Sequence, residues 1–212
     1  MSQSSFGNKF KVTTWGESHG KALGAVIDGC PAGLPLCEED IQKFLDRRKP
    51  GQSRYTTARK EGDLVEILSG VFEGKTTGTP ISLMVRNTDQ RSRDYGNIAY
   101  SYRPGHADYT FDQKYGFRDY RGGGRSSGRE TIGRVAAGAI ASKILGELGI
   151  SICTYTRSIG PVEIASFNKE EIHQNAFYMP DAQAAVKAGE YLEECMKNQD
   201  SAGGVIECRI TG

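Results

Sequence analysis

The sequence lacks several features that would place it in a common class of protein. Its 27 lysines and arginines nearly balance its 26 aspartates and glutamates, and the formal net charge is only +1. A general nucleic-acid-binding protein is more often basic overall, so this balance argues against that class. The chain contains no apolar run long enough to span a membrane. Its N-terminal segment also lacks the apolar core of a secretory signal peptide.

Cysteine and histidine are scarce as well. The five cysteines form no CxxC pair; they are Cys30, Cys37, Cys153, Cys195 and Cys208. Their odd number and wide spacing indicate neither a disulfide framework nor a zinc site, and they suit a reducing cytoplasm. The three histidines do not occur in a metal-binding spacing such as HExxH. We therefore expect a cytoplasmic protein without a metal centre.

Glycine is abundant, with 27 residues, and it marks the most informative stretch of the chain. Between Arg103 and Leu145 the sequence has a histidine on a Pro-Gly turn, then arginines among glycines and serines, then a long segment of small residues. The arginines of this run are Arg118, Arg121, Arg125, Arg129 and Arg134, and Gly122, Gly123 and Gly124 lie in its middle. Such a density of glycine indicates tight turns or close approaches of the backbone.

Two patterns predict that a helix begins at Ser127. This serine stands three residues before Glu130, which is the spacing of a capping box. Apolar residues then recur at helical spacing from Ile132 to Ile144. Gly138 and the alanines around it leave room for another backbone to approach closely.

This arrangement predicts a binding site for an anion with more than one negative group. A glycine loop leading into a helix offers backbone N–H groups and the positive end of the helix dipole. Neighbouring arginines add planar donors suited to phosphate and carboxylate. The alternative is a flexible Arg-Gly-rich tract that contacts RNA. We favour the folded site because the glycines lead directly into a capped, periodic helix.

The rest of the chain alternates short strands and helices. The predicted strands are residues 10–15, 23–27, 64–71, 81–85, 150–159 and 203–211, and the predicted helices are residues 37–48, 169–174 and 181–197. The glycine-punctuated link before residues 81–85 favours an antiparallel pair with the preceding strand. On the last strand, Ile206, Cys208 and Ile210 share one face.

Two histidines lie in loops that suit chemistry. The sequence GESHG connects the first two predicted strands, where a loop bounded by glycines directs Ser18 and His19 at a ligand. His106 follows a Pro-Gly turn. Residues 54–60 form a basic loop, and residues 87–103 form a long polar loop of the kind that is often functional. His173 has no comparable context and is expected to be an ordinary surface residue.

Loop histidines, two groups of arginines and an anion-binding helix start predict an enzyme that acts on a multiply anionic, phosphorylated small molecule. No side chain is placed as an activated nucleophile. Acid–base chemistry, elimination and a cofactor-dependent reaction remain open as reaction classes.

Longer motifs resemble one family. Residues 16–20, GESHG, continuing to the turn Asp28-Gly29-Cys30-Pro31, resemble the first signature of chorismate synthase. The sequences RPGHAD at residues 103–108 and DYRGGGRSSGRET at residues 119–131 resemble its second conserved region. DRRKPG at residues 46–51 and NTDQRS at residues 87–92 match as well. The chain thus resembles chorismate synthases over essentially its whole length.

The resemblance implies the 1,4-elimination of phosphate from 5-enolpyruvylshikimate 3-phosphate, which yields chorismate. It implies a requirement for reduced FMN, although the reaction is redox-neutral overall, and NADPH as a flavin reductant in bifunctional members. A substrate with one phosphate and two carboxylates accounts for an arginine-dense site. Neither nucleic acid nor a membrane is implied as a partner, and the family's usual assembly is a homotetramer.

The family's residue roles carry over to matching positions. His19 is implied as the acid that protonates the departing phosphate, and His106 as the group that protonates the reduced flavin or holds its charge. Arg48 and Arg54 face the ligand in a region associated with NADPH. The other implied residues are Ser18, Arg129 and Arg134 for the substrate, and Arg125, Ser126 and Ser127 for the flavin.

The implied fold is α+β, a layered β-α-β sandwich in which helices pack between antiparallel sheets. Residues 1–212 read as a single domain, apparently truncated at its C-terminal end. The family's later lysine-threonine-serine stretch and Arg-Asp motif are not in this sequence. We therefore expect this chain alone to bind FMN poorly and to turn over little or no substrate. The alternatives are an inactive anion- or FMN-binding fragment and an Arg/Gly-rich nucleic-acid-binding module.

Overall fold

The computed structural model describes residues 4–49, 51, 62–88 and 99–212. The chain divides into two compact units, the first formed by described residues up to Ile144 and the second by Leu145–Gly212. Each unit has its own group of buried apolar side chains. The single domain predicted for residues 1–212 stays a prediction, and the two units are described separately.

The first unit is built on a five-stranded antiparallel sheet in the order β1-β2-β3-β7-β4. Its strands are β1 (Ser5–Phe6), β2 (Lys11–Gly16), β3 (Ala22–Asp28), β7 (Ile81–Arg86) and β4 (Val65–Ile67). The antiparallel pairing predicted between residues 64–71 and residues 81–85 is confirmed for β4 and β7, with Val65 opposite Val85. Residues 64–71 do not form one strand, however. β4 ends at Ile67, and β5 (Val71–Phe72) pairs with β6 (Lys75–Thr76) as a separate small hairpin.

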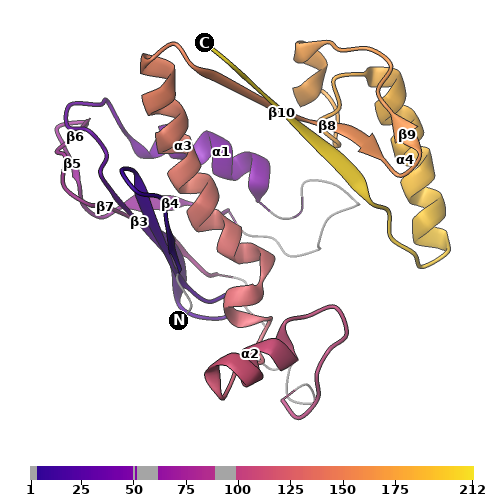
Figure 1. Ribbon diagram of the computed structural model, residues 1–212, viewed down its shortest axis with the longest axis horizontal. Helices are drawn as coiled ribbons and strands as arrows, with labels where there is room; N and C mark the ends of the chain where they lie inside the picture. Colours follow the sequence, from indigo (N-terminus) through magenta and orange to yellow (C-terminus); the bar gives the residue numbers. More distant parts are fainter. Residues whose placement is uncertain (1–3, 50, 52–61, 89–98) are drawn as a thin grey trace. The chain divides into compact units, whose positions relative to one another are not determined.

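One face of this sheet is buried under two helices, α1 (Glu38–Arg48) and α3 (Thr131–Glu147). Alternate side chains of β3 point to that face, and the helices contribute Ile41 and Ile140 to the same cluster. Figure 1 shows α3 running across the sheet, with α1 beside it. The helix predicted at residues 37–48 is therefore confirmed, with Cys37 as its N-cap.

The approach to α3 differs from the predicted capping box. Two short 3₁₀ turns, η2 (Gly124–Ser126) and η3 (Gly128–Glu130), precede the helix. Ser127 caps the second turn, and its hydroxyl accepts from the Arg129 N–H at 3.3 Å. Glu130 does not complete the box, because its carboxylate accepts from Thr14 of β2 at 2.6 Å and from Arg134 at 2.8 Å. A tertiary contact thus replaces the local one.

The close backbone approach on α3 occurs at Gly133 and not at Gly138. A Cβ on Gly133 would lie 2.8 Å from the Gly24 carbonyl oxygen of β3 and 3.0 Å from a methyl of Thr14. A Cβ on Gly138 would meet nothing within 4 Å. The prediction for Gly138 was wrong because that position lies on the exposed side of the helix.

The helix α2 (Asp108–Tyr115) was not predicted from the sequence. It is short, and its apolar residues lie on no single side, so its periodicity is weak. A usable signal was Gly116, which ends the helix in the left-handed conformation with φ of 82°.

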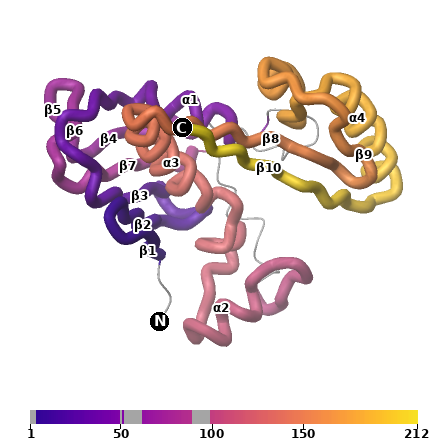
Figure 2. Tube along the Cα trace, turned by 45° about the horizontal axis from the view of Figure 1, so that its top comes forward, coloured from indigo at the N-terminus to yellow at the C-terminus, as the bar shows by residue number. Residues whose placement is uncertain are grey.

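The second unit is a three-stranded antiparallel sheet in the order β10-β8-β9, with a helix packed against it. Its elements are β8 (Ser151–Ile159), β9 (Val162–Glu163), η4 (Lys169–His173), α4 (Ala182–Lys197) and β10 (Gly204–Thr211). These bounds confirm the elements predicted for residues 150–211. Figure 2 shows β8 and β10 running alongside each other. The predicted face of Ile206 and Ile210 is largely exposed within this unit.

Asp181 organises the entry to α4. Its carboxylate accepts four backbone N–H groups, two from the first turn of the helix and two from Ala165 and Ser166. These bonds, with the Ala184 N–H the strongest contributor, hold the pKa of Asp181 at about 2.

Among the described helices, none is both long and apolar enough to cross a bilayer.

Candidate active site

The GESHG loop connects β2 to β3 and carries two buried polar side chains. Only 1% of Ser18 and 7% of His19 is exposed. The loop turns through a hydrogen bond from the Gly20 N–H to the Glu17 carbonyl at 3.0 Å. Ser18 then bonds the glycine run twice, from its N–H to Gly124 O and from its hydroxyl to Gly122 O, both at 3.3 Å. Two motifs distant in sequence thus form one site.

Gly122 leaves the space that the His19 ring occupies. A Cβ at Gly122 would lie 2.2 Å from Cδ2 and 2.3 Å from Nε2 of His19, and the residue has φ of 60°. Both facts require glycine at this position. The glycine run therefore does more than turn the chain, because it forms one wall against the imidazole.

The arginines of the run bond carboxylates of the chain itself, and this favours the ordered site over a flexible tract. The ion pairs are Arg118–Asp112 at 2.7 Å, Arg121–Asp119 at 2.8 Å, Arg125–Glu130 at 3.4 Å, Arg129–Asp63 at 3.0 Å and Arg134–Glu130 at 2.8 Å. Burial of Asp119 opposes its ionisation, but the hydrogen bonds and charge of Arg121, together with the nearby His19, lower its pKa overall. Burial likewise opposes ionisation of Glu130, and bonds from Arg134 and Thr14 lower its pKa overall.

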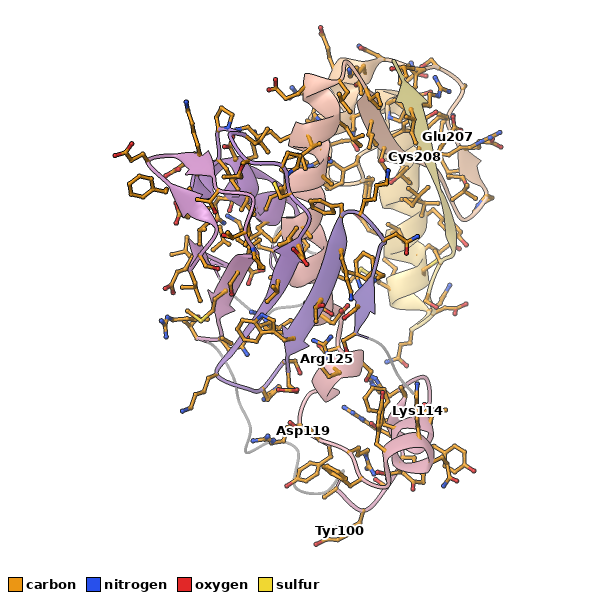
Figure 3. The ribbon with its side chains drawn as sticks, turned by 60° about the vertical axis from the view of Figure 1, so that its left-hand side comes forward. Tyr100, Lys114, Asp119, Arg125, Glu207 and Cys208 are labelled. Atoms are coloured by element: carbon orange, nitrogen blue, oxygen red, sulfur yellow. The ribbon has the colours of Figure 1, made fainter. Side chains whose placement is uncertain are left out.

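Arg125 connects the run to the end of β2. Its Nη1 donates to the Gly16 carbonyl at 2.8 Å, and its Nη2 donates to the Thr14 hydroxyl at 2.6 Å. Figure 3 labels Arg125 beside the ends of the strands, with Asp119 on the loop that follows α2. This arginine holds the loop against the sheet in addition to any contact with a ligand.

A buried network lies next to the GESHG loop and contains two of the predicted substrate residues. Asp63, whose side chain is 0% exposed, accepts from Arg48 at 2.6 Å and from Arg129 at 3.0 Å. Arg129 also donates from Nε to the side chain of Asn87 at 3.1 Å. The amide of Asn87 in turn donates to the carbonyls of Glu17 and Gly20 at 3.1 and 2.8 Å. The network thereby reaches the loop that carries His19.

The RPGHAD motif closes on itself through an ion pair. Arg103 donates from Nε and Nη2 to the two oxygens of Asp108 at 2.9 Å, and its backbone N–H adds a third bond at 3.0 Å. This bonding by Arg103 holds the pKa of the Asp108 carboxyl at about 2. His106 lies exposed on the turn so formed.

A cavity of about 900 Å³ opens beside the run in the first unit. Its lining includes the aromatic residues Trp15, Phe111, Tyr115 and Phe117 and the cationic residues Lys114, Arg118, Arg125 and Arg134. Its volume falls within the range of small-molecule sites. The guanidinium of Arg134 also lies 5.0 Å from the centre of the Phe6 ring.

The structure brings some predicted residues together and separates others. His19 and Ser18 contact the glycine run, and Arg48 and Arg129 share the adjacent network. The hydroxyl of Ser126 bonds Gly123 O at 2.7 Å, so it stabilises the loop. Arg54 lies outside the described residues. In the described ranges, no group of three or more His, Cys, Asp or Glu side chains is arranged to hold a metal ion.

Sequence reasoning missed Asp63 and Asn87. Asp63 stands in an acidic Glu-Gly-Asp segment without periodicity, and its one signal was an acidic residue directly before a strand. Asn87 stands at the start of the matched sequence NTDQRS, so it was noticed without a role.

Comparisons with known proteins agree on one family. The family model described as chorismate synthase matches residues 10–212. The chorismate synthase of Agathobacter rectalis is 71% identical over the whole chain, and that of Lachnoclostridium phytofermentans is 67% identical. A solved structure, described as the crystal structure of chorismate synthase, matches 96% of the chain with a TM-score of 0.76 and 34% identity.

The chain spans 58% of the length of these two curated relatives and 57% of the solved chain. The solved structure and the antiparallel sheets with their helices confirm the predicted α+β class. Since the family model covers nearly all of the sequence, the resemblance of the motifs is confirmed: this chain belongs to the chorismate synthase family.

Proposed function

We propose that the protein containing this chain eliminates phosphate from 5-enolpyruvylshikimate 3-phosphate in a 1,4 sense and so produces chorismate. The observation that carries the proposal is the buried His19, held by the glycine run and linked through Asn87 to a pair of arginines. A proton donor and fixed positive charges both stabilise the negative charge that develops on a departing phosphate.

In this proposal His19 supplies the proton that the departing phosphate oxygen takes up. The position of the ring against Gly122 and the loop bonds of Ser18 restrict the directions that the imidazole can adopt. With 7% of the residue exposed, few water molecules compete for its proton. Elimination breaks the carbon–oxygen bond, whose electron pair leaves with phosphate, and one ring carbon–hydrogen bond, whose electron pair becomes a second ring double bond. The ring hydrogen leaves as a proton to a base, so the reaction is redox-neutral overall.

Arg48 and Arg129 bind substrate anions in this proposal. Arg129 is 5% exposed and the side chain of Arg48 is 18% exposed, so both act where water screens charge weakly. Guanidinium groups recognise phosphate and carboxylate through paired donors. Ser18 and Arg134 complete the proposed substrate contacts, and Arg54, outside the described residues, belongs to the proposed NADPH region with Arg48.

The residues around the cavity fit a reduced flavin such as FMN. Four aromatic and four cationic side chains line a space of about 900 Å³, together with three carboxylates, of which Asp119 and Glu130 are paired with arginines. The aromatic side chains suit a planar ring system, and the excess of cations over carboxylates suits its phosphate. Of the proposed contacts, Arg125 lines this cavity. Ser126 and Ser127, the other proposed contacts, and His106, the proposed proton donor to the flavin, are assigned by family resemblance and are not among its lining residues. When bound, reduced flavin supplies an electron-rich group that assists the elimination. NADPH is the proposed reductant.

The test uses a chimeric enzyme in which this chain replaces the matching segment of the Agathobacter rectalis relative, which is 71% identical. We expect phosphate release and chorismate absorbance under anaerobic conditions with reduced FMN. His19→Ala should lower kcat by about 100-fold or more, in line with loss of a general acid. A chimera that folds and releases no phosphate from this substrate would refute the proposed reaction.

A separate proposal concerns the isolated chain, which spans 58% of the length of the Agathobacter rectalis relative. We propose that the isolated 212-residue chain binds FMN weakly and is inactive. Turnover by this chain above a blank with reduced FMN would contradict that.

The nucleic-acid-binding alternative is disfavoured because the arginines of the run bond nearby carboxylates. A cytoplasmic location and a homotetramer are proposed for the whole protein by family resemblance.

A further inference from the structure

One buried carboxylate serves two arginines that are far apart in the sequence. Arg48 Nη1 donates to Oδ2 of Asp63 at 2.6 Å, and Arg129 Nη1 donates to Oδ1 at 3.0 Å. The contrast with Asp108 is informative, because there a single arginine takes both oxygens in a bidentate pair. By giving one oxygen to each partner, Asp63 sets the separation between two guanidinium groups.

Asp63 is itself held in place from α1. The side-chain amide of Gln42 donates to the Asp63 carbonyl at 3.3 Å, and its oxygen accepts from the Val65 N–H at 3.0 Å. Asp63 has φ of 46°, a left-handed conformation that is unfavourable for residues other than glycine and is kept where the surroundings stabilise it. The carboxylate is therefore fixed by a backbone that cannot relax easily.

Each arginine has a second anchor besides Asp63. Arg48 donates from Nε to the Thr131 hydroxyl at 3.1 Å, at the start of α3. Arg129 donates from Nε to Asn87 at 3.1 Å, and Asn87 donates to the GESHG loop. A change at Asp63 is therefore transmitted to both arginines and, through Arg129 and Asn87, to the loop of His19.

The charges of the cluster favour an anionic ligand. Two guanidinium groups and one carboxylate leave the three side chains with one net positive charge in a place where Asp63 is fully buried. A pair of arginines with a fixed separation matches a phosphate or a carboxylate pair better than two mobile ones, because the ordering cost is met before binding.

We propose that Asp63 is a positioning residue for the phosphorylated substrate, which sets the spacing and orientation of Arg48 and Arg129 and couples them to the His19 loop. The inference rests on the proposed function, in which these two arginines bind substrate anions. It assigns to Asp63, whose side chain is fully buried, a role exerted through the two arginines.

The decisive variant is Asp63→Asn, because asparagine keeps the shape and loses one acceptor. Its carbonyl oxygen can still accept from one arginine, but its NH₂ group faces the donor of the other. One of the two guanidinium groups must then move. The variant also removes a negative charge beside two cations, so a purely electrostatic role of Asp63 predicts tighter anion binding, whereas a positioning role predicts weaker binding.

The first measurement is the titration of inorganic phosphate into the 212-residue chain by calorimetry, with circular dichroism as the check of folding. We expect Asp63→Asn to weaken phosphate binding roughly tenfold, the scale of one lost charge-assisted hydrogen bond. Glu66→Gln is the matched control, because it removes a carboxylate that pairs with Arg86 on the exposed side of the neighbouring strand. Binding by Asp63→Asn that equals or exceeds the wild type overturns the proposal, and so does a wild-type chain that binds no phosphate.

Asp63→Glu covers the case in which the asparagine variant does not fold. It keeps the charge that compensates the arginines but places the carboxylate one methylene further out. In the Agathobacter rectalis chimera we expect a rise in KM for the substrate and a kcat/KM lower by about 100-fold, the cost of a misplacement near 1 Å. A KM and a kcat/KM equal to those of the wild type in Asp63→Glu would refute the positioning role. An inactive wild-type chimera would instead refute the proposed function, and the phosphate titration would still decide the role of Asp63.

Discussion

His19 owes its position to Gly122, a residue far away in the sequence. A methyl group at Gly122 would occupy the space of the imidazole, with contacts of 2.2 and 2.3 Å to ring atoms. Such contacts are too short for any side chain, so the ring would have to leave its place against the glycine run. The proposed acid thus depends on the absence of a side chain opposite it.

We predict that Gly122→Ala in the chimera lowers kcat by about 100-fold, because a displacement of roughly 1 Å misaligns a catalytic group. Steady-state phosphate release would measure it. Gly116→Ala is the matched control, since Gly116 has φ of 82° and open space around a Cβ. It adds backbone strain at a positive φ without the clash, so it should cost stability and leave kcat unchanged. Equal losses in both variants would show that strain, and not the His19 contact, causes the effect.

Asp108 provides a test by pH. Hydrogen bonding from Arg103 lowers the pKa of Asp108 from 3.8 to about 2 in the folded chain. A depressed pKa contributes stability that is complete above the unfolded-state pKa and is lost as the pH falls through that value toward 2. Urea unfolding of the wild type should therefore show a falling midpoint between about pH 4 and pH 2. Asp108→Asn should be less stable at neutral pH and show a smaller fall, whereas Asp28→Asn, an exposed control, should follow the wild type.

At the scale of elements, α3 approaches β3 through a pair of glycines. Gly133 faces Gly24 so closely that a Cβ would lie 2.8 Å from a backbone oxygen, which cannot move aside without shifting the strand. Five residues along the same helix, Gly138 faces open space. Of these two positions, only Gly133 makes a backbone contact that excludes a side chain.

This contrast predicts opposite effects of one substitution. Gly133→Ala should destabilise the first unit by about 1–3 kcal/mol, the usual cost of overpacking. Gly138→Ala should stabilise it by about 0.5–1 kcal/mol, because alanine has the higher helix propensity. Urea unfolding followed by far-ultraviolet circular dichroism measures both. Destabilisation by Gly138→Ala would mean that another part of the protein packs against α3 at Gly138 and leaves no room for a methyl group.

The described part of the chain contains two separate cores. One joins the five-stranded sheet with α1 and α3, and the other gathers Met179 and three alanines of α4 beneath the smaller sheet. The four N–H bonds to Asp181 stabilise only the second core. Independent cores unfold independently unless the surface they share is large and apolar.

We therefore predict that the 212-residue chain unfolds in two steps in urea. Asp181→Ala should lower the free energy of unfolding in one step by about 2–3 kcal/mol and move that step to lower urea. The variant removes a helix cap and leaves buried N–H groups without an acceptor. Gly133→Ala should shift the other. A single transition that both variants move by the same amount would show that the chain behaves as one cooperative domain.

The sequence by itself determined most of the local structure and the family. Strand alternation, helix periodicity and the motifs GESHG and RPGHAD are properties of neighbouring residues, so they can be read without a fold. The same reasoning failed for α2, which has weak periodicity, and for residues 64–71, where a bend at Ser69 and Gly70 separates β4 from the β5–β6 hairpin.

Only the tertiary structure decided which groups meet at the site. Glu130 was predicted to cap its own helix, yet it accepts from Thr14, 116 positions away, and Arg129 bonds Asp63 across 66 positions. The sequence showed many arginines and an anion-binding pattern, but it did not show that Asp63 divides its oxygens between two of them. Burial explains the difference: a charged group taken out of water must find a partner in space, and the fold alone brings that partner within reach.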